Sequence, residues 1–552
     1  MRSANLDFIA AAYDDRSMTM ALSASYWPAG PSVDVRESTV PTVLREAAEQ
    51  HGARTAIVEG TAALPRDRRR WTFEQLLDES EKVAGALLER FEPGERVACW
   101  APNIPEWVLV EFGCGLAGLV LVTVNPAYQP KELEYVLRQS EASGIFLADE
   151  FRGNPMLSIL EKVTPGLPAL REQIRFADFA EFVASSPASP RFPEVKPTDP
   201  AQIQYTSGTT GFPKGALLHH RGLTNNARAF AEILGLTPGD TYVSPFPLFH
   251  TAGCVLGTLG ALQSGAALVP VHIADPSLIL DLVETEHADV LLGVPTVLLS
   301  VLESPDLAER DVSSVRVVGS GGAIVPAELV RRCEEAFGAQ FSIVYGSTEC
   351  SPLVAQVRLD DSFVDKTETL GRPVPQVEVK IVDAESGEVV PCSAVGELCV
   401  RGYNVMHGYY NMPEKTAESI DQDGWYHTGD LASMDDRGFI RIEGRLKDMI
   451  IRGGENIYPR EIEDLLFEHA KVAEVAVVGV PDAKWGESVA AVVRLVPGET
   501  VTEGELAAYC QQHLAPQKTP KLWEFVDTFP VTASGKIQKF ILRDRLTAAQ
   551  CT

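Results

Sequence analysis

The chain has 552 residues, of which 45% are hydrophobic and 22% charged, and its formal net charge at pH 7 is -28. This length predicts about three or four domains with a sizeable core, and the acidic balance argues against nucleic acid and anionic membranes as partners. The nine cysteines are an odd number without CxxC spacing, so we expect free thiols in a reducing cytoplasm, with neither a disulfide framework nor a zinc site.

The N-terminal thirty residues carry three aspartates and lack the basic-then-apolar pattern of a signal peptide. We therefore expect residues 1–30 to be an extension ahead of the folded chain. The most apolar run, residues 107–124, is interrupted by Glu111 and three glycines. Such a run predicts a buried helix followed by a strand, and no membrane span.

Short apolar strands alternate with helices between residues 41 and 345, which predicts a parallel sheet with helices on its faces. The expected strands cover residues 55–58, 96–99, 119–124, 144–147, 241–244, 267–271, 290–293, 315–319 and 341–345. The expected helices include residues 41–52, 71–88, 131–139 and 223–234.

Beyond residue 377 the pattern changes twice. Strands at 377–382, 396–401 and 439–442 are separated by turns and predict a small β-rich subdomain. After Gly444, helices at 459–468 and 503–513 and strands at 475–480 and 489–495 predict a compact α+β domain.

The segment from Tyr205 to Gly215 reads YTSGTTGFPKG and contains hydroxyls, glycines and one lysine, with no acidic residue. Glycines allow backbone N–H groups to approach a ligand closely, and hydroxyls and Lys214 add donors and a positive charge. The segment therefore predicts a phosphate-binding loop, although it lacks the spacing of a Walker A motif. The alternative is a glycine-rich surface turn with a solvated lysine.

Two further motifs lie at expected strand ends, where ligands bind in parallel sheets. In residues 345–349, Tyr345 could stack on a base, Thr348 could donate to phosphate and Glu349 could hold Mg²⁺. Residues 319–323 read GSGGA and could let a flat ring or an acyl chain lie against the backbone. A strand-to-loop turn and a tight glycine turn are the respective alternatives.

Four charged positions in the C-terminal part of the chain complete the set of candidates. Asp430 ends the segment YHTGD at an expected turn and could bind ribose hydroxyls, or it could form an Asx-turn. In the segment GRLKD, Arg445 could hold phosphate or ribose and Lys447 could be a hinge, or both could be solvated charges. Lys536 lies in a Gly/Ser loop, where a lysine is most often simply solvated.

Six segments occur in a fixed order between Thr206 and Lys539: TSGTTGFPKG, PLFHTAG, YGSTE, YHTGD, GRLKDMIIRGGENIYPREIE and SGKIQK. In these the chain resembles the adenylate-forming superfamily, which includes acyl-CoA synthetases, insect luciferases and peptide-synthetase adenylation domains. The segment NMPEKTAE and the full GGENIYPREIE stretch most resemble the fatty-acyl-CoA synthetase branch, for medium or long chains. Residues 342–344 depart from the Gly/Gln-rich approach of many relatives, which leaves the shape of the acyl pocket open.

The resemblance implies an α/β fold. Its large N-terminal domain, residues 31–444, would combine two parallel-sheet α/β subdomains with a small β-barrel-like subdomain. A hinge would join it to a small, mobile α+β domain, residues 445–552.

The resemblance also implies roles for individual residues. ATP would be bound by Thr206, Ser207, Gly208, Thr209, Thr210, Gly211, Lys214, Gly321, Gly322, Ala323, Tyr345, Gly346, Ser347, Asp430 and Arg445. The catalytic residues would be Lys536, Glu349, Thr348 and His250, and the metal ligands Glu349 and Thr206. CoA binding and the hinge would involve Lys447, Gly453 and Gly454, and the acyl pocket His250, Thr251, Cys254, Val294, Gly319 and Gly346.

The implied reaction joins a hydrophobic carboxylic acid to coenzyme A, with ATP and Mg²⁺, through an acyl-adenylate and release of pyrophosphate. We expect small-molecule partners, a cytoplasmic location and, as one possible assembly, a homodimer. Three alternatives stay open: an enzyme that loads a carrier protein, a ligase for an aryl or terpenoid acid, and a non-catalytic nucleotide-binding relative. Intact Lys536, Glu349 and Asp430 count against the last of these.

Overall fold

The computed structural model describes residues 21–30, 34–206, 213–453, 455–482, 484–531 and 537–550. The chain forms two compact units. The first contains Trp27–Val379 and Val400–Tyr426, and the second contains Leu22–Tyr26, Lys380–Cys399 and His427–Thr552. The domain boundary after residue 444 stays a prediction.

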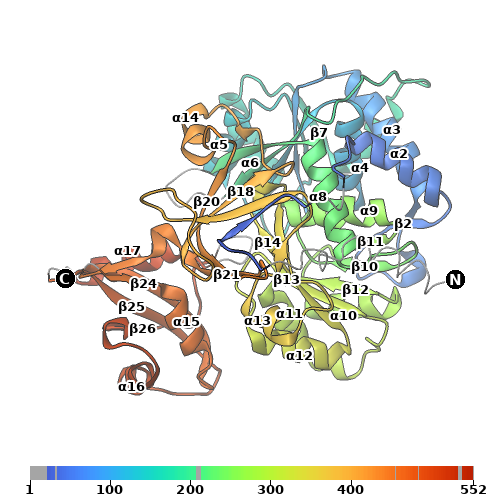
Figure 1. Cartoon of the computed structure of the whole chain (residues 1–552). Helices are drawn as coiled ribbons and strands as arrows, with labels where there is room; N and C mark the ends of the chain where they lie inside the picture. Colours follow the sequence, from blue (N-terminus) through green and yellow to red (C-terminus); the bar gives the residue numbers. More distant parts are fainter. Residues whose placement is uncertain are drawn as a thin grey trace. The chain divides into compact units, whose positions relative to one another are not determined.

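A nine-stranded sheet in the first unit has the order β16-β15-β14-β13-β12-β10-β11-β2-β3 (Figure 1). The six strands from β14 to β2 run parallel, and β15, β16 and β3 are antiparallel at the edges. The strands are β2 (Thr55–Val58), β3 (Arg70–Thr72), β10 (Thr241–Ser244), β11 (Ala267–Pro270), β12 (Val290–Leu292), β13 (Val317–Gly321), β14 (Gln340–Gly346), β15 (Leu353–Gln356) and β16 (Arg372–Pro373). Its apolar core includes side chains of α10 (Pro276–Thr285), α11 (Pro295–Leu302) and α12 (Ala327–Phe337).

A seven-stranded sheet of the same unit has the order β19-β9-β8-β5-β4-β6-β7. The five strands from β8 to β7 are parallel, whereas β9 and β19 extend the sheet in antiparallel fashion. The strands are β4 (Arg96–Trp100), β5 (Val120–Val124), β6 (Gly144–Leu147), β7 (Glu172–Arg175), β8 (Pro200–Thr206), β9 (Lys214–His219) and β19 (Gly408–Tyr409). Helices α5 (Pro130–Gln139) and α6 (Met156–Val163) supply side chains to its core.

Several helices of the first unit pack mainly on one another. Helix α4 (Pro105–Leu116) is buried at almost every position because its sequence is nearly all apolar, and it begins at a proline, whose fixed φ suits a first helical turn. Thr72 and Gln75 form a capping box for its neighbour α3 (Phe73–Leu88). The other members are α2 (Val40–His51), α8 (His220–Ile233), the π-helix η5 (Ala252–Leu259) and α9 (Gly260–Ser264), and α7 (Phe179–Ala184) lies against α3.

A five-stranded sheet has the order β1-β17-β18-β20-β21, with β1 (Tyr26–Trp27) and β21 (Ile440–Arg445) at its edges. Its inner strands are β17 (Val377–Val382), β18 (Gly396–Gly402) and β20 (Tyr426–Met434). The short helix α14 (Pro413–Ser419) lies in the connection that leads to β20, whereas α13 (Phe363–Glu368) connects β15 to β16 of the nine-stranded sheet.

The C-terminal part of the second unit is built on strands in the order β23-β22-β25-β24, with β26 paired to β25. The strands are β22 (Ile450–Arg452), β23 (Glu455–Ile457), β24 (Val472–Asp482), β25 (Gly486–Leu495) and β26 (Leu522–Phe525). Helices α15 (Pro459–Phe467) and α16 (Glu503–His513) pack on one face through Ile462, Leu466 and Leu506, and Leu542 of α17 (Lys539–Gln550) belongs to a second apolar cluster.

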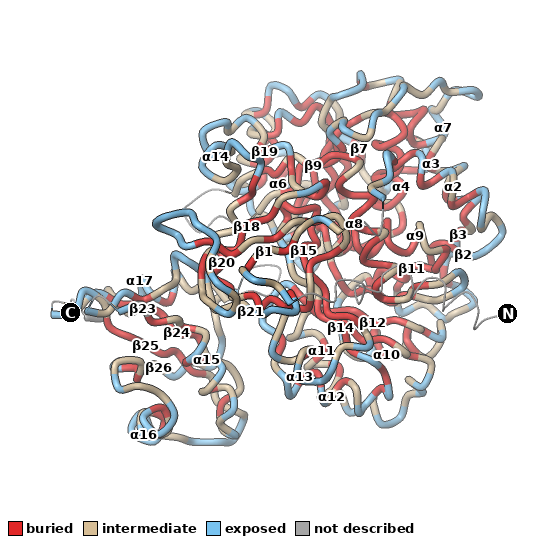
Figure 2. The backbone as a smooth tube through the Cα atoms, viewed as in Figure 1, coloured by how far each residue is buried: buried red, intermediate tan, exposed pale blue. Residues whose placement is uncertain are grey.

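The α/β class and both parallel sheets are confirmed. The inner strands of these sheets are mostly buried (Figure 2). Among the features that were not predicted are the antiparallel strands β9 and β19 and the π-helix. The turn predicted at Tyr426–Asp430 is wrong, because these residues open β20. All eight cysteines among the described residues are free, and no described helix is long and apolar enough to cross a membrane.

Candidate active site

The predicted phosphate loop connects two antiparallel strands. Thr206 ends β8 and Lys214 begins β9, and the two residues are register partners. The Thr206 hydroxyl also donates to the Lys214 carbonyl at 3.4 Å. Residues 207–212, and with them the predicted ligands Ser207, Gly208, Thr209, Thr210 and Gly211, lie outside the described residues. The β8–β9 hairpin therefore fixes both ends of the candidate loop.

Lys214 lies over an aromatic ring from a distant part of the chain. Its Nζ is 4.0 Å from the ring centroid of Tyr409 in β19, a geometry in which the ring face attracts a cation. Burial lowers the pKa of Lys214, and the nearby carboxylate of Glu349 opposes that shift. The hairpin thus presents its lysine close to a negative charge of the same unit.

Glu349 lies in a 3₁₀ turn, η7 (Thr348–Cys350), directly after β14. The residue is 7% exposed, and its Oε1 accepts a hydrogen bond from the Tyr409 hydroxyl at 2.8 Å. Burial and this carboxylate raise the pKa of Tyr409, so the hydroxyl keeps its proton and donates. A buried, oriented carboxylate is the kind of hard oxygen ligand that Mg²⁺ takes in proteins, so the donor set fits that ion.

Packing requires glycine at three positions of the strand-end motifs, and backbone conformation favours it at a fourth. A Cβ at Gly346 would lie 1.8 Å from the Pro352 carbonyl oxygen, and one at Gly321 would lie 2.5 Å from that of Val344. A Cβ at Gly319 would lie 2.9 Å from Cγ of Leu292. Gly322 has φ +77° and begins an exposed turn that continues through Ala323. The GSGGA segment is therefore the end of β13 and the turn after it, while Tyr345 is half-buried at the end of β14.

The predicted acyl-pocket residues lie in different surroundings. Thr251 and Cys254 are fully buried at the start of the π-helix, a distortion that is frequent at functional sites. The Thr251 hydroxyl has no hydrogen-bond partner among the described residues. His250 Nδ1 accepts from the Ala252 backbone N–H at 3.1 Å, and Val294 is the residue before α11.

Cys254 belongs to a buried polar network that the sequence did not indicate. Gln204 donates to its Sγ at 3.2 Å and to Gln202 Oε1 at 2.9 Å, and Gln202 donates to Glu111 at 2.8 Å. Complete burial raises the pKa of Glu111 well above its ordinary value. The protonated acid costs less to bury among apolar helices than the carboxylate would.

In the second unit, Asp430 and Arg445 face each other across β20 and β21. They are register partners, and Arg445 Nε lies 2.9 Å from Asp430 Oδ1. Asp430 is 8% exposed, whereas the Arg445 side chain is 48% exposed. Cross-strand pairing, and not an Asx-turn, therefore holds this carboxylate.

The remaining candidates also belong to the second unit. Lys447 lies in the 3₁₀ turn η8 (Leu446–Asp448) directly after β21. Gly453 has φ +63° and donates its N–H to the Trp485 carbonyl at 2.7 Å. Gly454 and Lys536 lie outside the described residues. An antiparallel bridge between Val531 and Ile537 closes the loop that contains Lys536.

The structure brings Lys214 and Glu349 together in one unit and Asp430 and Arg445 in the other. Sequence reasoning missed Tyr409, because nothing in the sequence around it indicates a partner sixty residues away. It also missed Glu397, whose carboxylate accepts a hydrogen bond from the Gly429 backbone N–H. That these residues bind ATP, Mg²⁺, the acid or CoA stays a prediction.

Comparison with known proteins identifies two domains in the chain. Residues 44–410 match the AMP-binding enzyme family, and residues 461–536 match the AMP-binding enzyme C-terminal domain. The chain is 41% identical over 537 residues to the putative acyl-CoA synthetase YngI of Bacillus subtilis, covering 92% of this chain and 97% of the relative. It is 39% identical to the mitochondrial medium-chain acyl-CoA ligase ACSF2 of Rattus norvegicus, covering 86% of this chain and 83% of the relative.

Solved structures share the fold of this chain over almost its whole length. The ATP-bound MatB of Rhodopseudomonas palustris superposes with a TM-score of 0.83 at 30% identity, over 92% of this chain and 99% of that one. The anthranilate CoA ligase AuaEII in complex with anthranoyl-AMP has a TM-score of 0.85 at 28% identity, over 94% and 99%. The chain thus belongs to the AMP-binding enzyme family of adenylate-forming enzymes, in its acyl-CoA synthetase branch.

Proposed function

We propose that this acyl-CoA synthetase activates a fatty acid of medium or longer chain as an acyl-adenylate and then transfers the acyl group to coenzyme A. The observation that carries the proposal is the arrangement of Lys214, Tyr409 and Glu349 beside the candidate phosphate loop. It supports the proposal because phosphates need a cation and Mg²⁺ needs hard oxygen ligands, and Lys214 and the buried, oriented Glu349 carboxylate could supply them.

In the first step, a carboxylate oxygen of the acid attacks the α-phosphorus of ATP and the bond to the β-phosphate oxygen breaks, so pyrophosphate leaves. Thr206 and Lys214 would hold the phosphates at the mouth of the β8–β9 hairpin. Glu349 and Thr206 would hold Mg²⁺, whose charge would offset that of the phosphates. Lys536 would lie where the two anions meet, because positive charge there stabilises the transition state most.

The remaining contacts with ATP follow the roles predicted for the individual residues. Tyr345, with Gly321, Gly322 and Ala323, would contact adenine, and Thr348 would donate to the α-phosphate. Asp430, supported by Arg445, would accept hydrogen bonds from the ribose hydroxyls.

In the second step, the CoA thiol attacks the acyl carbonyl carbon and AMP leaves. A rotation at Lys447 would withdraw Lys536 and present Gly453 and Gly454 to the pantetheine arm. The positive φ of Gly453 and its bond to Trp485 support a backbone shape that only glycine adopts readily.

The choice of acid rests on the predicted pocket and on the relatives. Thr251, Cys254, Val294 and Gly319 are small or apolar, which favours a hydrophobic acyl group, and His250 would contact the carboxylate. The ACSF2 relative is named a medium-chain ligase, which supports an aliphatic acid over an aryl one.

The test is pyrophosphate release by the purified chain with ATP and Mg²⁺ across straight-chain acids of two to eighteen carbons, benzoate and anthranilate, each with and without CoA. We expect the highest kcat/KM for acids of six carbons or more, and a thioester product only when CoA is present. Turnover confined to aromatic acids would refute the fatty-acid assignment. Adenylate formation without any transfer to CoA would instead favour a carrier protein as the acceptor.

A further inference from the structure

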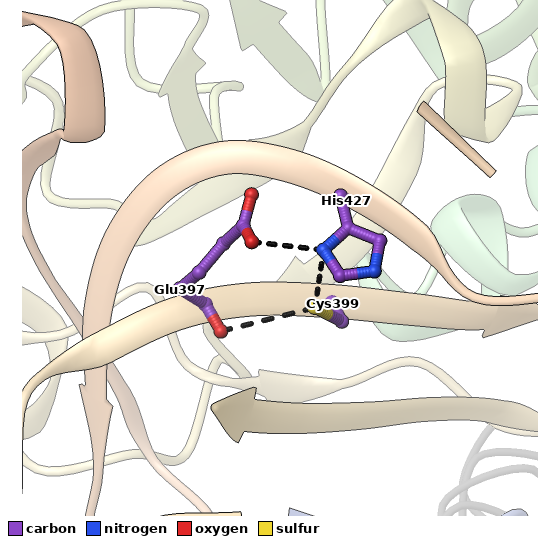
Figure 3. A group of neighbouring side chains, drawn as sticks. All are labelled: Glu397, Cys399 and His427. Carbon is purple, nitrogen blue, oxygen red and sulfur yellow. Dashed lines mark hydrogen bonds and ion pairs between the residues drawn. The ribbon is translucent and has the colours of Figure 1, made fainter. Parts of the chain in front are cut away.

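Three side chains of the second unit meet on two neighbouring strands. Glu397 and Cys399 come from β18, and His427 comes from β20 (Figure 3). The Nδ1 atom of His427 lies 2.8 Å from Glu397 Oε2 and 3.5 Å from Cys399 Sγ. The Glu397 side chain is only 12% exposed and that of His427 is 32% exposed.

The Glu397 carboxylate makes a second contact two residues further along β20. Its Oε1 accepts a hydrogen bond from the backbone N–H of Gly429 at 3.1 Å. Gly429 has φ +69°, a left-handed conformation that glycine adopts at little cost. One carboxylate therefore holds the residues on both sides of Thr428.

Thr428 completes the attachment of this segment to β18. Its hydroxyl donates to the Leu398 carbonyl at 2.8 Å and accepts from the Asp430 backbone N–H at 3.0 Å. Each residue of the kinked segment 427–429 is thus bound to β18, His427 and Thr428 through their side chains and Gly429 through its backbone N–H. The segment leads directly into Asp430. We propose that Glu397 is a positioning residue that fixes the Asp430 carboxylate for the ribose hydroxyls of ATP, an inference that rests on the ribose role proposed for Asp430.

The charge state supports a hydrogen-bonded pair in this cluster. Hydrogen bonds from the His427 ring to Cys399 and Glu397 raise the pKa of His427 to about 10. The ring is therefore an imidazolium at neutral pH. Burial raises the pKa of the Cys399 thiol. A zinc ion would need both groups deprotonated, and the 2.8 Å separation of nitrogen and oxygen is that of a hydrogen bond.

A small displacement of Asp430 matters because a site that recognises hydroxyls tolerates errors of only about 0.5 Å. Without Glu397, the Gly429 N–H and the imidazolium lose their shared acceptor. The kink is then free to relax, and Asp430 moves with it. The defect should appear as a loss of selectivity for the ribose hydroxyls, since the phosphate ligands of the other unit are unaltered.

The experiment measures kcat/KM of adenylation by the full chain with ATP, 2′-deoxy-ATP and 3′-deoxy-ATP. Hydrogen bonds to a charged group set the expected preference of the parent for ATP at about tenfold to hundredfold. Asp430→Asn calibrates the assay and should bring that preference close to one. Glu397→Ala should reduce it by about fivefold or more, and Glu397→Gln, which keeps an acceptor, should recover part of it.

The matched control is Glu378→Gln. Glu378 on β17 is a similarly shielded carboxylate, 18% exposed, and pairs with Arg401 at 2.8 Å. This variant should keep the parental preference. If Glu397→Ala does not fold cooperatively, Glu397→Gln and His427→Asn, which each weaken the contact without emptying the site, serve in its place.

The outcomes separate the two hypotheses. An unchanged preference in Asp430→Asn would remove the ribose role of Asp430, and this inference with it. A preference lost in Asp430→Asn but retained in both Glu397 variants would overturn only the positioning role. Equal losses with ATP and both deoxynucleotides in Glu397→Ala would show a merely structural residue, and stoichiometric zinc lost in that variant would assign the cluster to a metal.

Discussion

Tyr409→Phe removes a single hydroxyl from the centre of the candidate active site. That hydroxyl donates to Glu349 Oε1 at 2.8 Å, and Glu349 is 7% exposed. The ring that lies 4.0 Å from Lys214 Nζ stays in place. The substitution therefore tests the orientation of the carboxylate without removing the lysine contact.

The expected magnitude follows from the kind of bond that is lost. A hydrogen bond to a charged group contributes about 1.5–3 kcal/mol. Without the hydroxyl, Glu349 must be ordered when ATP–Mg²⁺ binds, and the cost can reach the whole of that free energy. At about 1.4 kcal/mol per tenfold, we expect kcat/KM for ATP to fall by about tenfold to hundredfold, and more Mg²⁺ to be required.

The assay is acid-dependent ATP–pyrophosphate exchange as a function of Mg²⁺, on Tyr409→Phe, Glu349→Gln and the double variant. Residues in direct contact show coupling energies of about 0.5–3 kcal/mol. Tyr410→Phe is the control, because the Tyr410 hydroxyl bonds to Glu141 at 3.1 Å on the surface. It should leave exchange unchanged. Additive effects of the two site substitutions, or full activity of Tyr409→Phe at low Mg²⁺, would refute the reasoning.

Three further predictions address other parts of the chain. Lys214→Ala should raise the KM for ATP by about tenfold or more with little effect on the denaturation midpoint, and unchanged kcat and KM would exclude Lys214 from the site. Lys536→Ala should abolish adenylation, since an ammonium about 4 Å from the reacting centre contributes about 4 kcal/mol, yet it should still convert supplied acyl-adenylate and CoA to thioester. Lys447→Pro should still form the acyl-adenylate but stall before the thioester. Equal loss of both steps in Lys536→Ala would contradict the proposed rotation at Lys447. Glu111→Gln tests the pH dependence of stability. Because burial raises the pKa of Glu111, the parent protein takes up a proton when it folds above about pH 4.5. Its free energy of unfolding therefore falls as pH rises, by up to about 1.4 kcal/mol per pH unit. The advantage of Glu111→Gln in urea denaturation should grow from pH 5 to pH 8, and a pH-independent difference would show that the carboxyl is ionised when folded.

The sequence alone predicts those elements whose signals are local. Strand β2 and helix α16 have the predicted bounds, Thr55–Val58 and Glu503–His513. Helix α16 begins at a capping box of Thr502 and Glu505, and β2 is a short apolar run between turns. Such signals need no partner elsewhere in the chain. The order of the six motifs likewise identified the family from the sequence.

Tertiary structure alone decided which of these residues meet. The segment Tyr426–Asp430 has the composition of a turn, yet it is a strand because Asp430 pairs with Arg445 in β21. The bonds of Tyr409 to Glu349 and of Glu397 to His427 join residues sixty and thirty positions apart. Pairing across sheets depends on register and on the course of intervening segments, which local periodicity does not encode. The sequence could therefore predict Glu349, Lys214 and Asp430 as site residues, but not the neighbours that orient them.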